Sequence, residues 1–305
     1  CITRSTVDCS GPRRLPEVLL PRGRVRAPRR PPAGAENGLY VAYPLVHSYG
    51  IVVQTGMKDK DASPSVSPHA PLRDFYADDA ERRQFLTRIF DETAPSYDGI
   101  AGLMSFGSGA WYRRNALRRA GLREGMHVLD VAVGTGEVAR GAMSIVGPSG
   151  RVLGVDPSIG MLRQARRKLG TPIVQGVAEQ IPFRDTTFDF LSMGYALRHV
   201  ADLRQPLAEY FRVLKPGGTL LILDFACPRS RIGETLGKFY LGGLVPWLSR
   251  MRFGSQAHVL TRYCWETVEE LVSPEVVVDS MKACGFEQVA GARFALLSEY
   301  VGRRP

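Results

Sequence analysis

One stretch decides the fold: Val128-Leu129-Asp130-Val131-Ala132-Val133-Gly134-Thr135-Gly136-Glu137-Val138-Ala139. Its apolar half predicts a buried strand over 127–133, and the glycines predict a tight turn into a helix over 136–146. Because Gly134 and Gly136 lack a β-carbon, a ligand can touch the backbone where the first N–H groups of the helix point outward. The stretch alone leaves three alternatives open: an adenosyl ligand, a nicotinamide dinucleotide, or an ordinary packing turn.

Short apolar runs alternate with helical patterns on the carboxyl side of this stretch. Strands are expected over 151–155, 172–177, 187–194 and 218–225, and helices over 158–169 and 202–214. The last third adds helices over 231–250 and 274–284 and two closing strands, within 288–290 and 294–301. Such alternation is typical of an α/β fold with a doubly wound parallel sheet.

The second expected strand ends at Asp156, 20 residues after Gly136. An acidic residue at this spacing can accept hydrogen bonds from both ribose hydroxyls of an adenosine. The structural alternative is an acid at a helix N-terminus, with Ser158 as the cap. The pairing of Asp156 with the glycine turn favours the nucleoside site.

The N-terminal part differs in composition from the rest of the 305 residues. Residues 1–56 are rich in Arg and Pro and lack a sustained helical or strand period, and a Ser/Pro-rich stretch follows. We interpret 1–77 as a disordered or leader segment; a basic arm for nucleic acid and a targeting peptide are the alternatives. Apolar residues at helical spacing from Phe85 onward predict a helical cap over 78–122 within a domain over 78–305.

Composition excludes several other classes. No apolar run is long enough to cross a membrane as a helix. The five cysteines lack a CxxC pair and are odd in number, so neither a disulfide framework nor a metal site is expected, and a cytoplasmic location suits them.

Motifs later in the chain distinguish S-adenosylmethionine from a nicotinamide dinucleotide as the ligand. The run Gly176–Phe183 follows the third expected strand, and Arg212–Gly218 precedes the fifth. With the glycine turn and Asp156, this order resembles the class I S-adenosylmethionine-dependent methyltransferases. Together with Phe90–Asp98, Leu103–Gly107 and Tyr195–Val200, it resembles the ubiquinone/menaquinone C-methyltransferase family over 85–303. The resemblance implies S-adenosylmethionine as cofactor and a Rossmann-like sheet of seven strands with the last antiparallel.

The resemblance also implies which residues bind the cofactor and which are catalytic. Its cofactor-binding residues would be Tyr97, Asp130, Gly134, Thr135, Gly136, Asp156, Pro157, Met161, Val177, Ala178, Glu179 and Gly194, and its catalytic residues Tyr195, Arg198 and His199. Arg198 would stabilise a phenolate on the substrate, and His199, or a water it positions, would take a proton. A structural ion pair is the alternative for Arg198, and a surface position is the alternative for His199. Val177 stands where the family has Asp or Asn.

These observations predict C-methylation of a phenolic or quinol-like, lipophilic small molecule. The alternatives are O- or N-methylation of another small metabolite, such as a polyketide or lipid, and a nucleic-acid-binding protein with a basic N-terminal arm. We expect a small-molecule partner and no nucleic acid. Peripheral membrane contact and the oligomeric state stay open.

Overall fold

The computed structural model describes residues 65–70, 72–226, 230–294 and 296–305, which all belong to one compact unit. The interpretation of residues 1–64 lies outside this range. Residues 65–70 and 72–77, expected in the leader, instead pack on the domain. Leu72 and Tyr76 are buried, and the N–H of Leu203 donates to the carbonyl of Val66 at 2.9 Å. The folded domain therefore begins before residue 78, because scattered apolar anchors hold a segment that has no period.

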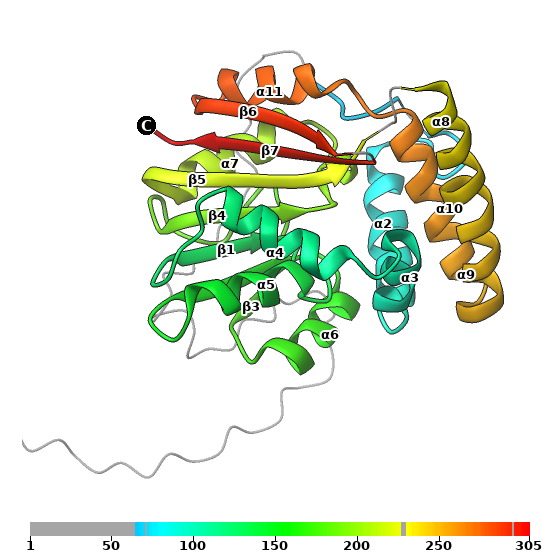
Figure 1. Ribbon diagram of the computed structural model, residues 1–305, viewed down its shortest axis with the longest axis horizontal. Coiled ribbons are helices and arrows are strands. Elements are labelled where there is room, and N and C mark those ends of the chain that lie inside the picture. The colour runs from blue at the N-terminus through cyan, green and yellow to red at the C-terminus, as the bar shows by residue number, and fades with distance from the viewer. Residues whose placement is uncertain (1–64, 71, 227–229, 295) are drawn as a thin grey trace, which may run out of the picture. The chain divides into compact units, whose positions relative to one another are not determined.

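A seven-stranded sheet forms the centre of the domain, in the order β3-β2-β1-β4-β5-β7-β6 (Figure 1). Strand β7 runs antiparallel to both of its neighbours, and the other pairings are parallel. This confirms the predicted seven strands with the last antiparallel. The strands are β1 (His127–Val131), β2 (Arg151–Asp156), β3 (Ile173–Gln175), β4 (Phe188–Gly194), β5 (Leu214–Phe225), β6 (Glu287–Phe294) and β7 (Leu297–Arg303).

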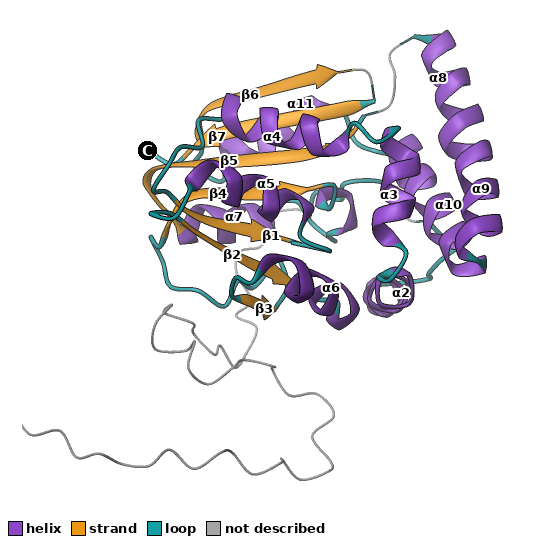
Figure 2. Cartoon of the chain, turned by 60° about the horizontal axis from the view of Figure 1, so that its bottom comes forward, coloured by secondary structure: helices purple, strands orange, loops and turns teal. Residues whose placement is uncertain are grey.

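Helices cover both faces of the sheet (Figure 2). The apolar sides of α4 (Gly109–Arg119), α5 (Glu137–Val146) and α6 (Ile159–Leu169) share one buried cluster with the central strands. On the other face, α7 (Arg204–Val213) and α11 (Pro274–Ala283) close a second cluster. Helix α4 was expected in the cap over 78–122; the buried side chains of Ala116 and Leu117 hold it on the sheet instead.

The cap lies at the carboxyl ends of the parallel strands (Figure 1). It comprises α2 (Asp79–Thr93), α3 (Tyr97–Ser105), α8 (Arg231–Gly237), a π-helical segment (Lys238–Leu244), α9 (Val245–Phe253) and α10 (Ser255–Glu269). Side chains of α2 and α10, with Phe85 and Tyr263 in contact at 5.2 Å between ring centroids, form its own apolar core. The cap thus combines segments from both ends of the domain. Within the described residues, no helix is long and apolar enough to span a bilayer.

Candidate active site

The glycine turn is fixed by backbone geometry and by packing. Gly134 and Gly136 have φ angles of +55° and +92°, in the left-handed region that favours glycine. A β-carbon on Gly136 would lie 2.7 Å from Cδ1 of Leu169 on α6. The turn therefore brings the start of α5 close to the carboxyl ends of β1 and β2, and it accepts no side chain at Gly136.

Asp156 is held beside this turn by two backbone donors. Its Oδ2 accepts from the N–H of Gly134 at 2.8 Å, and its Oδ1 accepts from the N–H of Ser158 at 2.9 Å. Burial raises the pKa of Asp156 to about 6, although both N–H groups favour the ionised form. Each oxygen keeps a lone pair, so the carboxylate can serve the helix terminus and still accept a pair of ligand hydroxyls.

Asp130 offers a second acceptor beneath the turn. The hydroxyl of Ser192 donates to its Oδ1 at 2.7 Å, whereas Oδ2 is buried and has no hydrogen-bond partner among the described residues. Burial raises the pKa of this carboxyl to about 7. A buried acceptor without a donor fits a ligand that brings one, and an amino-acid ammonium group does so. The glycine turn, Asp156 and Asp130 thus fit S-adenosylmethionine.

The other predicted cofactor residues lie at the same edge of the sheet. Gly194 ends β4, and a β-carbon there would meet Cγ2 of Val138 at 2.7 Å. Val177 follows β3 and is 41% exposed, with Ala178 and Glu179 half-buried beyond it. The exposed Pro157 and the buried Met161 flank the start of α6. Contact of these side chains with the cofactor stays a prediction.

Two cap residues contact this edge that belong to the Phe90–Asp98 motif but were not predicted as site residues. Asp98, on α3, accepts from the hydroxyl of Thr135 at 2.6 Å and pairs with Lys168. Asp91 on α2 uses Oδ1 to accept from the Ser158 hydroxyl at 2.5 Å and from the N–H of Gly160 at 2.8 Å. Hence both cap helices are bonded directly to elements of the cofactor site.

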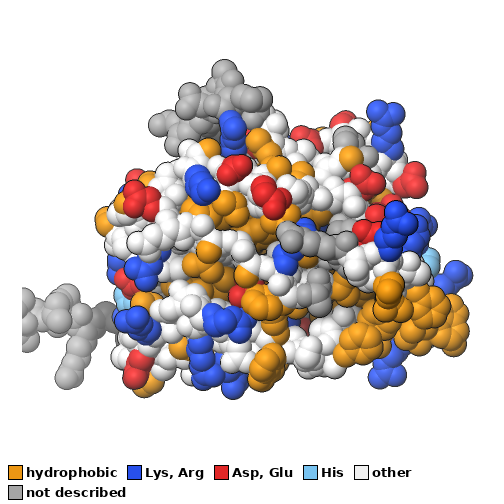
Figure 3. Space-filling view, turned by 45° about the horizontal axis from the view of Figure 1, so that its top comes forward, with side chains coloured by type: hydrophobic (Ala, Val, Ile, Leu, Met, Phe, Trp, Pro, Cys, Tyr) orange, Lys and Arg blue, Asp and Glu red, His pale blue; other side chains and the backbone are white. Residues whose placement is uncertain are grey.

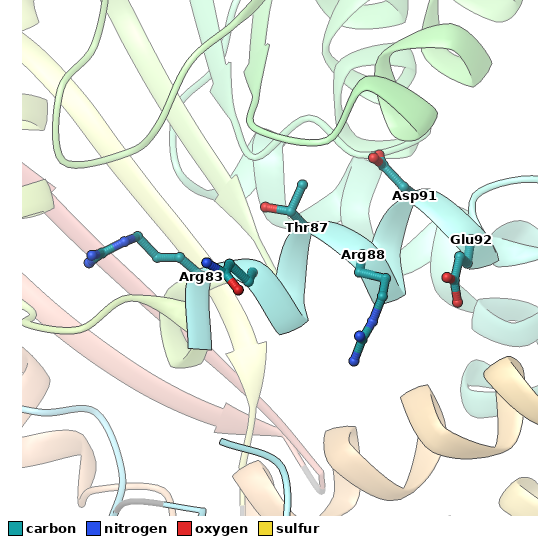
Figure 4. A pocket seen from close by; sticks show the side chains of 6 residues that line it. Arg83, Thr87, Arg88, Asp91 and Glu92 are labelled. Carbon is teal, nitrogen blue, oxygen red and sulfur yellow. The ribbon is translucent and has the colours of Figure 1, made fainter. Parts of the chain in front are cut away.

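A surface hollow lies on α2 close to Asp91. Its lining comes from this helix alone, and none of the predicted site residues belongs to it (Figure 4). The Asp91 side chain points away from that of Arg88 in this view, which agrees with its bonds to α6. We therefore place the site at the sheet edge and not in the hollow.

Arg198 is buried behind the end of β4, only 2% exposed. Its Nη1 donates to Oδ1 of Asp224 at 2.6 Å and to the carbonyl of Tyr195 at 2.7 Å. The structural ion pair is therefore present. Nη2 lies 3.7 Å from the Sγ of Cys264, the guanidinium lies over the ring of Phe225, and Nε has no hydrogen-bond partner among the described residues. The guanidinium thus has donors that its structural bonds do not use.

His199 is half-buried and packs against side chains of the cap. Its ring stacks on Tyr263 at 5.5 Å between centroids, and Nδ1 lies 3.1 Å from the Tyr263 hydroxyl. The ring of Phe90 meets it edge-on. Burial, and then the positive charge of Arg198, hold the pKa of His199 well below its usual range. The imidazole is accordingly neutral at pH 7, and the lowered pKa makes it a weaker base than a free histidine.

Two tyrosines border the same region. Tyr195 has an unusual φ of +61°, and burial raises its pKa to about 12. Tyr97 on α3 also has a raised pKa, mainly through burial, and the charges of Arg198 and Asp156 both act on its phenol. Tyr97 thus lies between the predicted cofactor side and the predicted catalytic side, and both phenols stay neutral at physiological pH.

Comparison with known proteins agrees with this geometry. The model of the ubiE/COQ5 methyltransferase family matches residues 77–296. The chain is 36% identical to the ubiquinone/menaquinone biosynthesis C-methyltransferase UbiE of Geobacter sulfurreducens, over 73% of this chain and 90% of that protein. It is 39% identical to a demethylmenaquinone methyltransferase of Symbiobacterium thermophilum, over 68% of this chain and 86% of that one.

Solved structures support the fold. Phosphoethanolamine N-methyltransferase 2 of Haemonchus contortus, in complex with S-adenosylmethionine, superposes with a TM-score of 0.54 at 20% identity, over 73% of this chain and 60% of that chain. The sheet order is that of a class I methyltransferase. The chain belongs to the ubiE/COQ5 methyltransferase family, whose methyl donor is S-adenosylmethionine and whose acceptor is a small molecule.

Proposed function

We propose that this enzyme methylates a ring carbon of a phenolic or quinol-like, lipophilic acceptor. The observation that carries the proposal is the pair Arg198 and His199, a buried cation with unused donors beside a neutral imidazole, directly after Gly194 at the end of β4. The names of two relatives, a C-methyltransferase of ubiquinone/menaquinone biosynthesis and a demethylmenaquinone methyltransferase, support the same acceptor class. A cytoplasmic enzyme with peripheral access to membranes fits such an acceptor.

S-adenosylmethionine, when bound, supplies a methyl group already activated by its sulfonium. The protein must then hold the acceptor carbon in line with that methyl, and placement of this kind accounts for most of the acceleration. Asp156 and the glycine turn would fix the nucleoside end. Tyr97 and Tyr195 would border the reacting groups, and their aromatic faces can stabilise a nearby cation.

Arg198 and His199 would act on the acceptor. A ring carbon becomes a nucleophile when a neighbouring hydroxyl loses its proton, and the free donors of Arg198 would stabilise the resulting phenolate. His199, or a water it positions, would take the hydroxyl proton. The ring then gives an electron pair to the new carbon–carbon bond as the bond from the methyl group to sulfur breaks and its electrons stay on sulfur. The ring regains aromaticity by losing the proton on the methylated carbon to water, and the phenolate regains its own proton from His199.

The test compares a polyprenylated naphthoquinone with its reduced form, the quinol. The reduced quinol can form a phenolate, whereas the quinone cannot. We expect methyl transfer from S-adenosylmethionine to the quinol under anaerobic conditions and no transfer to the quinone. Equal transfer to both would contradict the role of a phenolate, and transfer only to amine or alcohol acceptors would replace the proposal with N- or O-methylation.

A further inference from the structure

In the outer helix of the cap, the large apolar side chains point to solvent and not into the apolar core. From Arg231 to Phe253, α8, the π-helical segment and α9 run continuously. Ile232 is 75% exposed, Phe239 69% and Met251 70%, and Leu236 and Trp247 are exposed on the same helical run. Exposed apolar residues that gather in a continuous patch mark an interaction site. Figure 3 shows the resulting apolar area at the right-hand edge, where Figure 1 places α8 and α9.

The inner side of the same helix includes two glycines that allow close packing. Gly237 and Gly242 both face Trp265 of α10, and a β-carbon on Gly242 would lie 2.9 Å from its Nε1. Leu241 and Val245 complete the buried contact. An amphipathic helix ordinarily buries its largest apolar residues. In this helix, close packing against Trp265 requires glycine on the buried side. The exposed aromatic residues on the other side therefore contribute nothing to the apolar core.

Positive charge accompanies the apolar side chains. Arg231, Lys238, Arg250 and Arg252 are all exposed on this run, and Glu234 is its one acidic residue between 231 and 253. Lys238 reaches Glu269 at 3.5 Å, whereas Arg231 and Arg250 make no ion pair among the described residues. Helices that lie in the headgroup layer of a membrane combine Trp, Phe and Leu with Lys and Arg in this way.

We propose that the exposed apolar face of residues 231–253, the cap face, docks on the surface of an anionic lipid bilayer. The apolar side chains would enter the boundary of headgroups and acyl chains, and the arginines would meet lipid phosphates. A second copy of the chain is a poorer occupant, since a symmetric contact would place the same cations of two subunits against each other. Opposite charge therefore favours the bilayer.

Docking on this face would also bring the site close to the lipid. The Tyr240 hydroxyl donates to the carbonyl of Leu103 at 2.5 Å, and its ring stacks on Phe106 at 4.4 Å. Both partners belong to the end of α3, the helix that carries Tyr97 and Asp98 at its start. A lipophilic acceptor would then have a short path from bilayer to site, a consequence that rests on the proposed function, whereas the docking itself does not.

The experiment measures co-sedimentation of the full chain with vesicles, without any acceptor. One set contains phosphatidylcholine alone, and the other contains phosphatidylcholine mixed with phosphatidylglycerol. We expect binding to the anionic vesicles. The variant Phe239→Ser/Trp247→Ser should bind at least about tenfold more weakly, whereas the matched control Phe239→Leu/Trp247→Phe should keep most of the affinity. Because both positions are exposed, neither variant should change the melting temperature.

A second pair of variants tests the charge. Arg231→Gln and Arg250→Gln should each weaken binding to the anionic vesicles by about fivefold. The matched control is Arg123→Gln/Arg303→Gln, which removes two exposed arginines at the opposite edge of the sheet and should change the binding far less.

Two outcomes would overturn the proposal. Equal sedimentation of the wild type and the serine variant would show that the cap face does not bind lipid. A stable dimer that the serine variant dissociates, with no vesicle binding by the wild type, would assign the face to a second copy. Either result leaves the acceptor assays unaffected, so failure of docking is distinct from failure of the proposed chemistry.

Discussion

Replacement of Arg198 separates its structural bond from its chemical role. Arg198→Met fills much of the space of the side chain but leaves Asp224, itself only 2% exposed, without its cation. Removing one partner of a buried ion pair costs about 3–5 kcal/mol of unfolding free energy. For a domain of this size that corresponds to a fall in melting temperature on the order of 10 °C. Turnover should fall as well, by about two orders of magnitude, because the donor to the phenolate is lost.

The double variant Arg198→Met/Asp224→Asn distinguishes the two effects. It removes both charges, and Asn keeps an acceptor for the N–H of Phe225, which donates to Asp224 at 2.8 Å. We expect most of the stability to return and turnover to stay low, measured by thermal unfolding and by methyl transfer to the quinol. Arg198→Lys should stay folded and recover only part of the rate, because a point charge lacks the planar fork. Full recovery of turnover in the double variant would refute the chemical role of Arg198.

Four further predictions concern the cofactor site and the domain boundary. Asp156→Ala should weaken S-adenosylmethionine binding by about 1–3 kcal/mol in calorimetry, because the ribose hydroxyls lose a charged acceptor; wild-type affinity would contradict the assignment. Since the pKa of Asp156 in the free protein is raised to about 6, affinity should fall as pH drops below this value and the acceptor is protonated, whereas Asp156→Asn should remove this part of the pH dependence. Asp91→Ala should lower the melting temperature by several degrees, because Ser158 and Gly160 lose their acceptor; an unchanged value would show that this contact adds no stability. Beginning the chain at Met57 should leave stability and cofactor affinity unchanged, and a large loss of either would show that the removed residues support the domain.

The sheet was predictable because its signals are local. Apolar runs such as 187–194, separated by glycines and helical periods, correspond to observed strands, and the glycine turn and Asp156 meet as their spacing indicates. The observed domain begins before its predicted start because long-range packing outweighs the local sequence pattern there. The residues between 65 and 77 show no helical or strand period, but buried side chains such as Leu72 hold them on the domain.

The partners of the site residues were not predictable in the same way. Asp224 was not among the predicted site residues, yet it forms the ion pair with Arg198 across 26 residues. Tyr263 could not be distinguished from an ordinary core residue until α10 placed its hydroxyl on His199. The helix over 231–250 was expected, but only its packing against Trp265 shows that the larger apolar residues point outward. Such contacts join segments that are far apart in the sequence, and no local sequence pattern indicates that they meet.

The position of the transferred methyl group on the product distinguishes C-methylation from O-methylation. The enzyme is supplied with S-adenosylmethionine labelled in its methyl carbon and with the anaerobic quinol, and the product is examined by carbon NMR. We expect a label bonded to a ring carbon adjacent to a carbon that bears oxygen, with a chemical shift typical of an aryl methyl group. A label with the shift of a methoxy group would show O-methylation and contradict the proposed roles of Arg198 and His199.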